Sequence, residues 1–454
     1  MEYYILLGLG ALTLALIGTA GLLLLWNKPV LVIYIQILFC NVMRYLSQQF
    51  HFPDSIKYIT DLLTLLLFVQ IIITRKDNLS RSLKKPFWAV AFFAITALIT
   101  STANLIFAPS NIVFFFWGIR IYFRFYVFFL ACVTFLSTKD IDYIFNILLA
   151  LLPINTIVSC IQFFVQGYRF DNVGGLFGMI VGCNSEMNLY LLVVGSIIAA
   201  RYIGGKINLL LAISGIFMIF FIAAISELKA VFIEVPVLLA IVALFSLPNR
   251  RSVILTVCGV CAILLFVPLF MYLYPSWTDF FSADSIRTYT TDANYGGNSG
   301  LNRMTAGAYI LENVHLTIPS KLFGIGLGNG DWFLWFSGWF FQKYQNLLYY
   351  FFLYAFLLLE VGLLGLVAYS MFFLSVFWDS IVAALKSKPP RRFYYYVPLV
   401  MCVMSFFLMV YNPSMRSETA YLLYFSLAVP YIARNEIVEY DLPCKKTVGN
   451  CTLN

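Results

Sequence analysis

Two arginines within an apolar stretch are the residues of this sequence with the clearest potential for chemistry. Arg120 and Arg124 stand in "FFFWGIRIYFRFYVFF", and their spacing of four residues places both on one face of a helix. At 1.5 Å per residue they lie roughly 12 and 18 Å from the start of the apolar run at residue 112. A charge at that depth in lipid costs at least ~2.5 kcal/mol, so an anionic partner or an aqueous cavity must offset it.

This arginine pair has two interpretations. A guanidinium fork fits two oxygens of a phosphate group, so the pair is suited to binding a polyanion. Alternatively, each arginine forms a structural ion pair with an acid on a neighbouring helix. The acids available for such pairs are Asp61, Glu227, Glu234 and Glu360. We favour the polyanion, because ion pairing alone rarely requires two arginines on one helix face.

Further polar residues fall at the ends of apolar runs on the same side as this pair. For contacts to a diphosphate, Arg303 is expected to join Arg120 and Arg124. The other expected substrate-binding residues are Lys229, Arg169, Arg44 and Arg416. Glu227 is the first candidate for a general base, followed by His315 and Asp61. The structural alternatives are a partner role for Glu227, beside Lys229 or Arg124, and a plain surface position for His315. No cluster of Asp, Glu and His has metal-ligand spacing, so neither a metal ion nor a cofactor is expected.

A glycine-rich segment, "KLFGIGLGNGDWF" at residues 321–333, invites a search for a nucleotide site. It lacks the Lys-Ser/Thr of a P-loop and the strand–turn–helix setting of a dinucleotide fold. Gly324, Gly326 and Gly328 instead predict a turn-rich loop that uses left-handed backbone. A sharper alternative is a backbone nest that closely approaches an anion or a sugar.

The amino-acid composition indicates that membrane helices position the candidate site residues. The chain has 454 residues, of which 62% are hydrophobic and only 11% are charged, whereas about a quarter of the residues of a soluble domain are charged. We expect an all-α, polytopic helical bundle of about 12–13 transmembrane helices, forming one membrane domain over residues 1–454. The apolar runs lie at about 3–26, 29–45, 57–74, 87–108, 112–136, 141–166, 186–200, 207–225, 229–247, 252–274, 347–377, 394–411 and 417–433.

The lysines and arginines predict the orientation of the bundle. Of the 29 basic residues, 18 fall in alternate connections and the C-terminal tail, which the positive-inside rule assigns to the cytoplasm. They are Lys28, Arg75, Lys76, Arg81, Lys84, Lys85, Lys139, Arg201, Lys206, Arg250, Arg251, Lys386, Lys388, Arg391, Arg392, Arg434, Lys445 and Lys446. The net charge of +8 is therefore mostly topological, and no nucleic-acid partner is indicated. The long connection at 276–346, expected to contain short helices, falls on the outer side, away from cytoplasmic nucleotides.

Three stretches in this order resemble the bacterial O-antigen polymerase and O-antigen ligase family of membrane glycosyltransferases. "GGLFGMIVGCNSEMNLYLL" is similar to the glycine-rich outer loop of the family, which leads into an Asn that opens the next span. "NRMTAGAYILENVHLTIPSKLFGIGLGNG" resembles its Arg-opened loop helix followed by Gly-x-Gly-x-Gly. "YYFFLYAFLLLEVGLLGLVAY" resembles the span with Glu and Gly-Leu-x-Gly that follows. The resemblance covers residues 170–375 and implies a GT-C-like helical architecture.

The chain departs from the family at two positions. Ligases of the family place a His shortly before the span with Glu, where this chain has Phe351 and Phe352. The family also often has Ser-Arg after the eighth span, where this chain has Ser226, Glu227 and Lys229. The resemblance therefore favours a repeat-unit polymerase for an O-antigen, capsule or exopolysaccharide over a His-based ligase.

The resemblance implies a multi-pass protein of the bacterial inner membrane that acts on its periplasmic or extracellular face. The expected reaction moves a glycan from a polyprenyl diphosphate, such as undecaprenyl diphosphate, to a sugar hydroxyl of a second lipid-linked unit. The implied partners are this lipid-linked oligosaccharide, membrane lipid, and a flippase and a chain-length regulator. The alternatives are ligation of glycan to a lipid or protein acceptor and transport of a lipid-linked oligosaccharide.

Overall fold

The structure is a computed structural model of the chain that describes residues 21, 24–74, 83–107, 111–246, 249–275, 282–287, 291, 300–333, 336–387 and 389–441. The first predicted span, at 3–26, lies almost entirely outside these residues. So do several of the basic residues assigned to the cytoplasm, namely Arg75, Lys76, Arg81, Lys388, Lys445 and Lys446.

The other twelve predicted spans each form a helix within the described residues, which confirms the all-α polytopic fold. Nine helices among these residues are long and apolar enough to cross a membrane, and α9 and α10 are shorter apolar helices. The twelve are α2 (Pro29–Phe50), α3 (Ile59–Thr74), α5 (Lys84–Phe107), α6 (Ile112–Phe135), α7 (Thr138–Cys160), α8 (Cys183–Ile203), α9 (Leu209–Ile225), α10 (Val231–Phe245), α11 (Arg250–Leu273), α16 (Leu353–Lys386), α17 (Pro389–Tyr411) and α18 (Ala420–Asp441).

Polar residues fix where several of these helices begin. The side chains of Asn111, Asn208 and Asn249 each accept a hydrogen bond from a backbone N–H in the first turn of α6, α9 and α11. Ser137 and Asp140 form a capping box at the start of α7. These bonds satisfy N–H groups that have no partner within the helix, which matters most where water is scarce.

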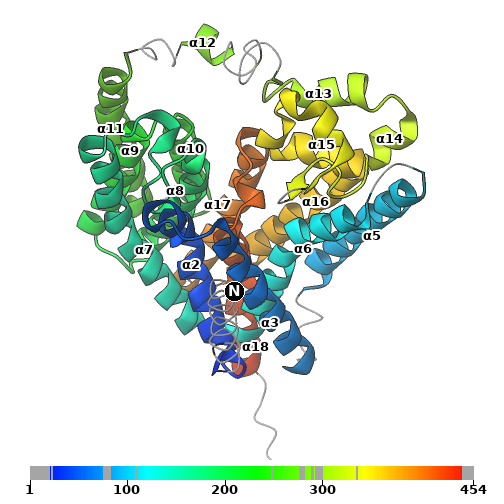
Figure 1. Ribbon diagram of the computed structural model, residues 1–454. Coiled ribbons are helices and arrows are strands. Elements are labelled where there is room, and N and C mark those ends of the chain that lie inside the picture. The colour runs from blue at the N-terminus through cyan, green and yellow to red at the C-terminus, as the bar shows by residue number, and fades with distance from the viewer. Residues whose placement is uncertain are drawn as a thin grey trace, which may run out of the picture.

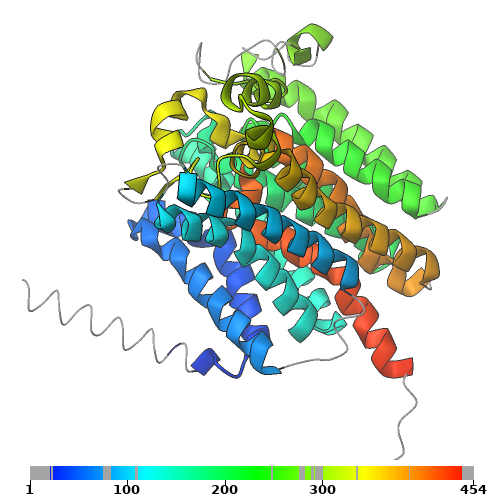
Figure 2. The same cartoon turned by 90° about the vertical axis from the view of Figure 1, so that its right-hand side faces the viewer.

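Short elements fill the connections at one end of the bundle. In Figure 1 the helices of the long connection lie at the end opposite the C-terminal end of α18, and Figure 2 shows the same separation from the side. Two residues each from β1 and β2 pair antiparallel there, with Trp332 opposite Ser337. The short elements are η1 (Asp54–Tyr58), η2 (Ile161–Val165), η3 (Phe170–Asn172), η4 (Gly175–Phe177), α12 (Ala283–Arg287), α13 (Ala306–Tyr309), η7 (Ile310–Val314), α14 (Ile318–Phe323), β1 (Trp332–Phe333), β2 (Phe336–Ser337), α15 (Trp339–Tyr344), η8 (Gln345–Leu347), η9 (Tyr349–Phe351) and η10 (Ser414–Arg416).

Helices α8 and α18 form the centre of the bundle. The most apolar 18-residue window of α8 is completely buried, and α18 is buried from Ala420 to Ala433. Because these faces meet protein in place of lipid, α18 can carry the buried tyrosines Tyr421, Tyr424 and Tyr431.

Ion pairs gather at the end of the bundle where the basic connections lie. Lys85 bonds to Asp379 at 2.8 Å, which joins the start of α5 to the end of α16. Arg201 at the end of α8 bonds to Asp142 at the start of α7, at 3.1 Å. Arg251 donates to the carbonyl of Tyr202 at 3.5 Å. The connections that the sequence assigns to one side therefore meet at one end of the molecule.

Candidate functional site

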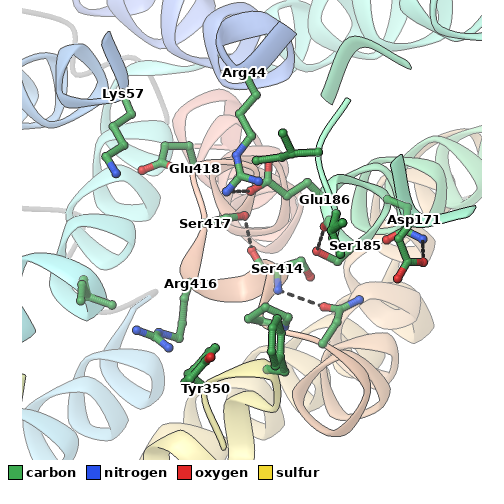
Figure 3. A pocket seen from close by; sticks show the side chains of 18 of the residues that line it. Arg44, Lys57, Asp171, Ser185, Glu186, Tyr350, Ser414, Arg416, Ser417 and Glu418 are labelled. Atoms are coloured by element: carbon green, nitrogen blue, oxygen red, sulfur yellow. Dashed lines mark hydrogen bonds and ion pairs between the residues drawn. The ribbon is translucent and has the colours of Figure 1, made fainter. Parts of the chain in front are cut away.

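A cavity of about 990 Å³ opens among the helix ends and loops at the opposite end of the bundle. We call it the chamber (Figure 3). Side chains from α2, η1, α6, α8, η10 and several connections line it, so distant parts of the sequence build one site. Seven basic and five acidic residues contribute to its wall, which leaves an excess of positive charge. They are Arg44, Lys57, Arg120, Arg124, Lys229, Arg303, Arg416, Asp171, Glu186, Glu227, Asp331 and Glu418.

The arginine pair on α6 forms the ion pairs that were the structural alternative, and it also borders the chamber. Arg120 and Arg124 line the chamber, and both also bond to acids. Arg120 donates from Nε and Nη2 to Asp61 Oδ2, at 2.9 and 2.6 Å. Arg124 donates from Nη1 to Asp61 Oδ1 and to Glu418 Oε1, at 3.2 Å each, and from Nη2 to the carbonyl of Arg416 at 3.1 Å. Carboxylates therefore balance the two guanidinium charges while one face of the cluster borders the chamber.

Aromatic rings hold Arg120 in place. Its guanidinium carbon lies 4.3 Å from the Trp117 ring centroid and 5.0 Å from that of Tyr58. Arg124 lies over Phe125, with 4.6 Å between the guanidinium carbon and the ring centroid. These cation–π contacts limit the motion of each guanidinium without occupying its donors.

Arg44 and Glu186 form the next pair along the wall. The Nη2 atom of Arg44, at the end of α2, lies 2.8 Å from Oε1 of Glu186, in the first turn of α8. Figure 3 shows these two side chains pointing toward each other, with Glu418 close by. Glu186 was not among the residues predicted to form the site, although its position at the start of an apolar run was a signal for it.

A strained turn between α9 and α10 supplies Glu227 and Lys229. Glu227 adopts a left-handed backbone with φ of 57°, which is uncommon for a residue with a side chain. Its Oε1 lies 2.9 Å from Lys229 Nζ, and both side chains are buried. Burial lowers the pKa of Lys229 below its ordinary 10.5, and the Glu227 carboxylate opposes this only in part. The partner role foreseen for Glu227 is therefore present, and the carboxylate also lines the chamber.

Arg416 and Arg303 complete the basic wall. Arg416 Nη2 donates to Asp331 Oδ2 at 2.9 Å, and Trp117 Nε1 donates to the same oxygen at 3.3 Å. Arg303 donates to the carbonyl of Tyr411 at 3.4 Å. Sequence reasoning missed Asp331 and Trp117 as site residues. Asp331 lies within the glycine-rich segment, directly after Gly330, which was the available signal.

The glycine-rich segment packs against a break in α16. Gly362 leaves the helical conformation with φ of 66°, and the N–H groups of Ile325 and Gly326 bond to the carbonyls of Leu359 and Glu360 at 3.0 and 2.8 Å. A Cβ on Gly324 would lie 2.6 Å from the Glu360 backbone, so close approach requires glycine there. Gly324, Gly326 and Gly328 do not line the chamber, and the segment acts on it through Asp331.

His315 and Arg169 also lie outside the chamber lining. The surface position expected for His315 is wrong, because its side chain is completely buried and its Nε2 lies 3.1 Å from the carbonyl of Leu358. Leu358 directly precedes Leu359 and Glu360, whose carbonyls accept hydrogen bonds from the glycine-rich segment. Burial lowers the pKa of His315, so its ring is neutral near pH 7. Arg169 donates to the carbonyl of Phe163 in η2 and to that of Tyr168.

Next to Arg124 and Glu418, aromatic side chains pack together in the interior of the bundle. Phe128 contacts Tyr421 with ring centroids 4.9 Å apart, and Phe125 and Phe372 stack on Tyr424 at 5.4 and 5.7 Å. We call these five residues the aromatic layer. All five are buried and come from α6, α16 and α18. The charged wall of the chamber is thus followed directly by an apolar core.

The chamber has the chemistry of a binding site for a large anion. Cationic donors from several elements face one cavity, and rings and carboxylates hold them in place. Among the described residues, no group of three or more His, Cys, Asp or Glu is placed to hold a metal ion. No protein-family model and no curated protein matches the chain.

Proposed function

We propose that this protein is a membrane glycosyltransferase that polymerises polysaccharide repeat units carried on a polyprenyl diphosphate. The chamber carries the proposal, because it combines an excess of basic residues with two arginines placed on a membrane helix. A diphosphate joined to a lipid and a glycan brings a compact negative charge to the edge of a bilayer. The sequence resemblance over residues 170–375 supplies the reaction class.

In the proposed reaction, a sugar hydroxyl of the acceptor attacks the anomeric carbon of the donor glycan. The new C–O bond forms as the bond from that carbon to the diphosphate oxygen breaks, and the electron pair leaves on the diphosphate. Arg120, Arg124 and their neighbours stabilise the charge that grows on the leaving oxygen. The chamber walls align the two reactants, and a base takes the proton of the hydroxyl.

Glu227 is the best placed of the three candidate bases. Its carboxylate lines the chamber, whereas Asp61 and His315 do not. Both oxygens of Asp61 already accept hydrogen bonds from Arg120 and Arg124, and His315 is buried against α16. The contact with Lys229, 2.9 Å from Nζ to Oε1, holds the Glu227 side chain in position.

Two features favour polymerisation over the alternatives. Phe351 and Phe352 line the chamber, so the position where ligases of the resembled family carry a His is apolar here. The long connection at 276–346 is unusual for a pure transporter, whose sequence commonly shows paired broken helices and internal repeats. Polymerisation is therefore the function that we adopt.

The test is to replace the chromosomal gene with variants and separate the cell-surface glycan on a gel. We expect Arg120→Ala and Arg124→Ala to leave single repeat units on their carrier while the protein level in the membrane stays normal. Lys85→Ala is the matched control, because it removes an ion pair at the other end of the bundle and should leave polymer length unchanged. Polymer of normal length in both arginine variants would refute the proposed role of the pair.

Asp61→Asn separates substrate binding from a purely structural ion pair. If the arginines bind phosphate, removal of the competing carboxylate should preserve or strengthen binding of undecaprenyl diphosphate by the purified protein in nanodiscs, while Arg120→Ala should weaken it. If Arg120 serves only to balance Asp61, the two variants should lose stability alike and neither should change affinity for the lipid.

A further inference from the structure

A second cavity adjoins the chamber at the side of the bundle. It has a volume of about 510 Å³ and lies between η1 and α3 on one side and α6 on the other. We call it the groove. It shares Trp117 and Arg120 with the chamber. Its other lining residues are Tyr58, Asp61, Leu62, Val113 and Phe116.

Exposed apolar side chains line the groove on the outer surface of two predicted membrane helices. Leu62 is 52% exposed, Val113 is 43% exposed and Phe116 is 60% exposed. Two of the helices long and apolar enough to cross a membrane, Ser55–Thr74 and Ile112–Phe135, carry these three side chains. The polar groups of the groove are concentrated at Asp61 and Arg120, where it meets the chamber.

Arg120 therefore stands at the boundary between two unlike environments. On one side lies a chamber wall with seven basic residues, and on the other lies an apolar groove open to lipid. An alkyl chain in the chamber would displace water from charged groups, which is unfavourable. Away from Asp61 and Arg120, the same chain in the groove contacts the apolar side chains of Leu62, Val113 and Phe116.

We propose that the groove holds the hydrocarbon chain of the lipid-linked substrate, which enters the chamber sideways between α3 and α6. The phosphate end contacts Arg120 and the chain leaves along Leu62, Val113 and Phe116. The identity of this occupant rests on the proposed function, whereas the route rests on Trp117 and Arg120, which line both cavities. Trp117 and Tyr58 flank the guanidinium at the junction, so the phosphate enters beside two aromatic rings.

Binding measurements with two probes test this route. The protein is reconstituted in nanodiscs, and the probes are undecaprenyl diphosphate and inorganic diphosphate. Val113→Trp fills the groove and should weaken binding of undecaprenyl diphosphate about tenfold, as overpacking of a site does. Binding of inorganic diphosphate should be unchanged. The control is Leu65→Trp, because Leu65 lies on α3, the helix across the groove from Val113, is 59% exposed and does not itself line the groove.

The outcomes separate this inference from the proposed function. If Val113→Trp binds undecaprenyl diphosphate as tightly as the wild type does, the chain lies elsewhere and only the route is refuted. If the wild type binds neither probe, the proposed substrate class fails as well.

A photoreactive residue at position 116 provides a second measurement that does not depend on the tryptophan variant. Benzoylphenylalanine in place of Phe116 should cross-link to added undecaprenyl diphosphate, and the same residue in place of Leu65 should not. Cross-links from position 116 to bulk phospholipid alone would refute the route.

Discussion

At the scale of single residues, the chamber is built from charge pairs that join distant segments. Arg44 pairs with Glu186, Arg124 with Glu418, and Arg416 with Asp331, and each pair links two different elements. A carboxylate that accepts from a guanidinium occupies the donors that a phosphate would use. The acids thus hold the basic wall together, and under the proposed function a phosphate group would compete with them for these donors.

Glu418 provides a prediction for pH dependence. Burial alone would raise the pKa of this carboxyl, but the guanidinium groups of Arg124, Arg44 and Arg120 bring it below its ordinary 4.5. Because the pKa is lowered on folding, ionised Glu418 should stabilise the protein fully above pH ~4.5, and this contribution should be lost as the pH falls through the folded value.

We therefore expect Glu418→Gln to lower the free energy of unfolding by about 3 kcal/mol near pH 7, as the loss of one partner of a buried pair does. The difference from the wild type should shrink toward pH 3. Thermal unfolding in detergent across this pH range measures it. A difference that is the same at pH 3 and pH 7 would contradict the assigned ionic role.

All the basic residues of the chamber except Lys57 could be predicted from sequence, but several of their acidic partners could not. Arg120 and Arg124 are conspicuous because a charge within an apolar run is costly in lipid. The contact between Arg416 and Asp331 joins segments 85 residues apart, and no local pattern encodes it. Glu186 and Lys57 stand at the edges of apolar runs, where a charge is ordinary.

At the scale of elements, the glycine-rich segment and the break in α16 support each other. A break in a membrane helix frees carbonyl groups that need donors, because lipid supplies none. His315, Ile325 and Gly326 contact the carbonyls of Leu358, Leu359 and Glu360 in turn. The Glu360 carboxylate then accepts from the N–H of Gly330 at 3.1 Å, next to Asp331. This chain of bonds positions the partner of Arg416.

Two glycine variants should separate backbone strain from crowding. Gly324 has φ of 76° and Gly167 has φ of 75°, so alanine is strained at both, at roughly 1–2 kcal/mol. A Cβ at Gly324 would press on the backbone of α16, whereas one at Gly167 has nothing within 4 Å. We expect Gly324→Ala to lower the midpoint of thermal unfolding clearly more than Gly167→Ala does. Equal shifts would mean that contact with α16 is not important for stability.

The glycine-rich loop and the span that forms α16 could be predicted from sequence, but the contact between them that requires glycine could not. With a nucleotide loop set aside, alternating glycines in sequence still suit either a turn-rich loop or an anion nest. The structure places them against α16, because the backbone there must come within hydrogen-bonding distance of Leu359 and Glu360. Gly362 in "LEVGLLGL" was the one local sign that this span contains a break.

At the scale of the whole molecule, charge divides the bundle into two unlike ends. The basic connections meet in pairs such as Lys85 with Asp379, and the chamber occupies the opposite end. Hydrophobic runs predicted the helices, and the fold class followed from them. The central places of α8 and α18 could not be predicted, because apolar composition does not distinguish a helix wrapped by protein from one that faces lipid.

Cysteine labelling tests the predicted orientation. In a variant without native cysteines, Lys57→Cys should react with a membrane-impermeant maleimide in intact spheroplasts, because Lys57 lines the chamber. Lys386→Cys, at the end of α16 with the basic connections, should react only after the membrane is permeabilised. The reverse pattern would place the chamber in the cytoplasm, where nucleotides are present, and would remove the need for a pre-activated lipid substrate.

The aromatic layer also bears on the energy supply of the cell. A hydrated cavity in a membrane protein is a potential leak for protons and sodium ions. Here stacked rings lie directly beneath the guanidinium groups, and an ion that reached them would have to give up its water. Cells that overproduce this protein should therefore keep their electrochemical gradient, and under the proposed function the free energy of transfer comes from the bond between the donor glycan and its diphosphate.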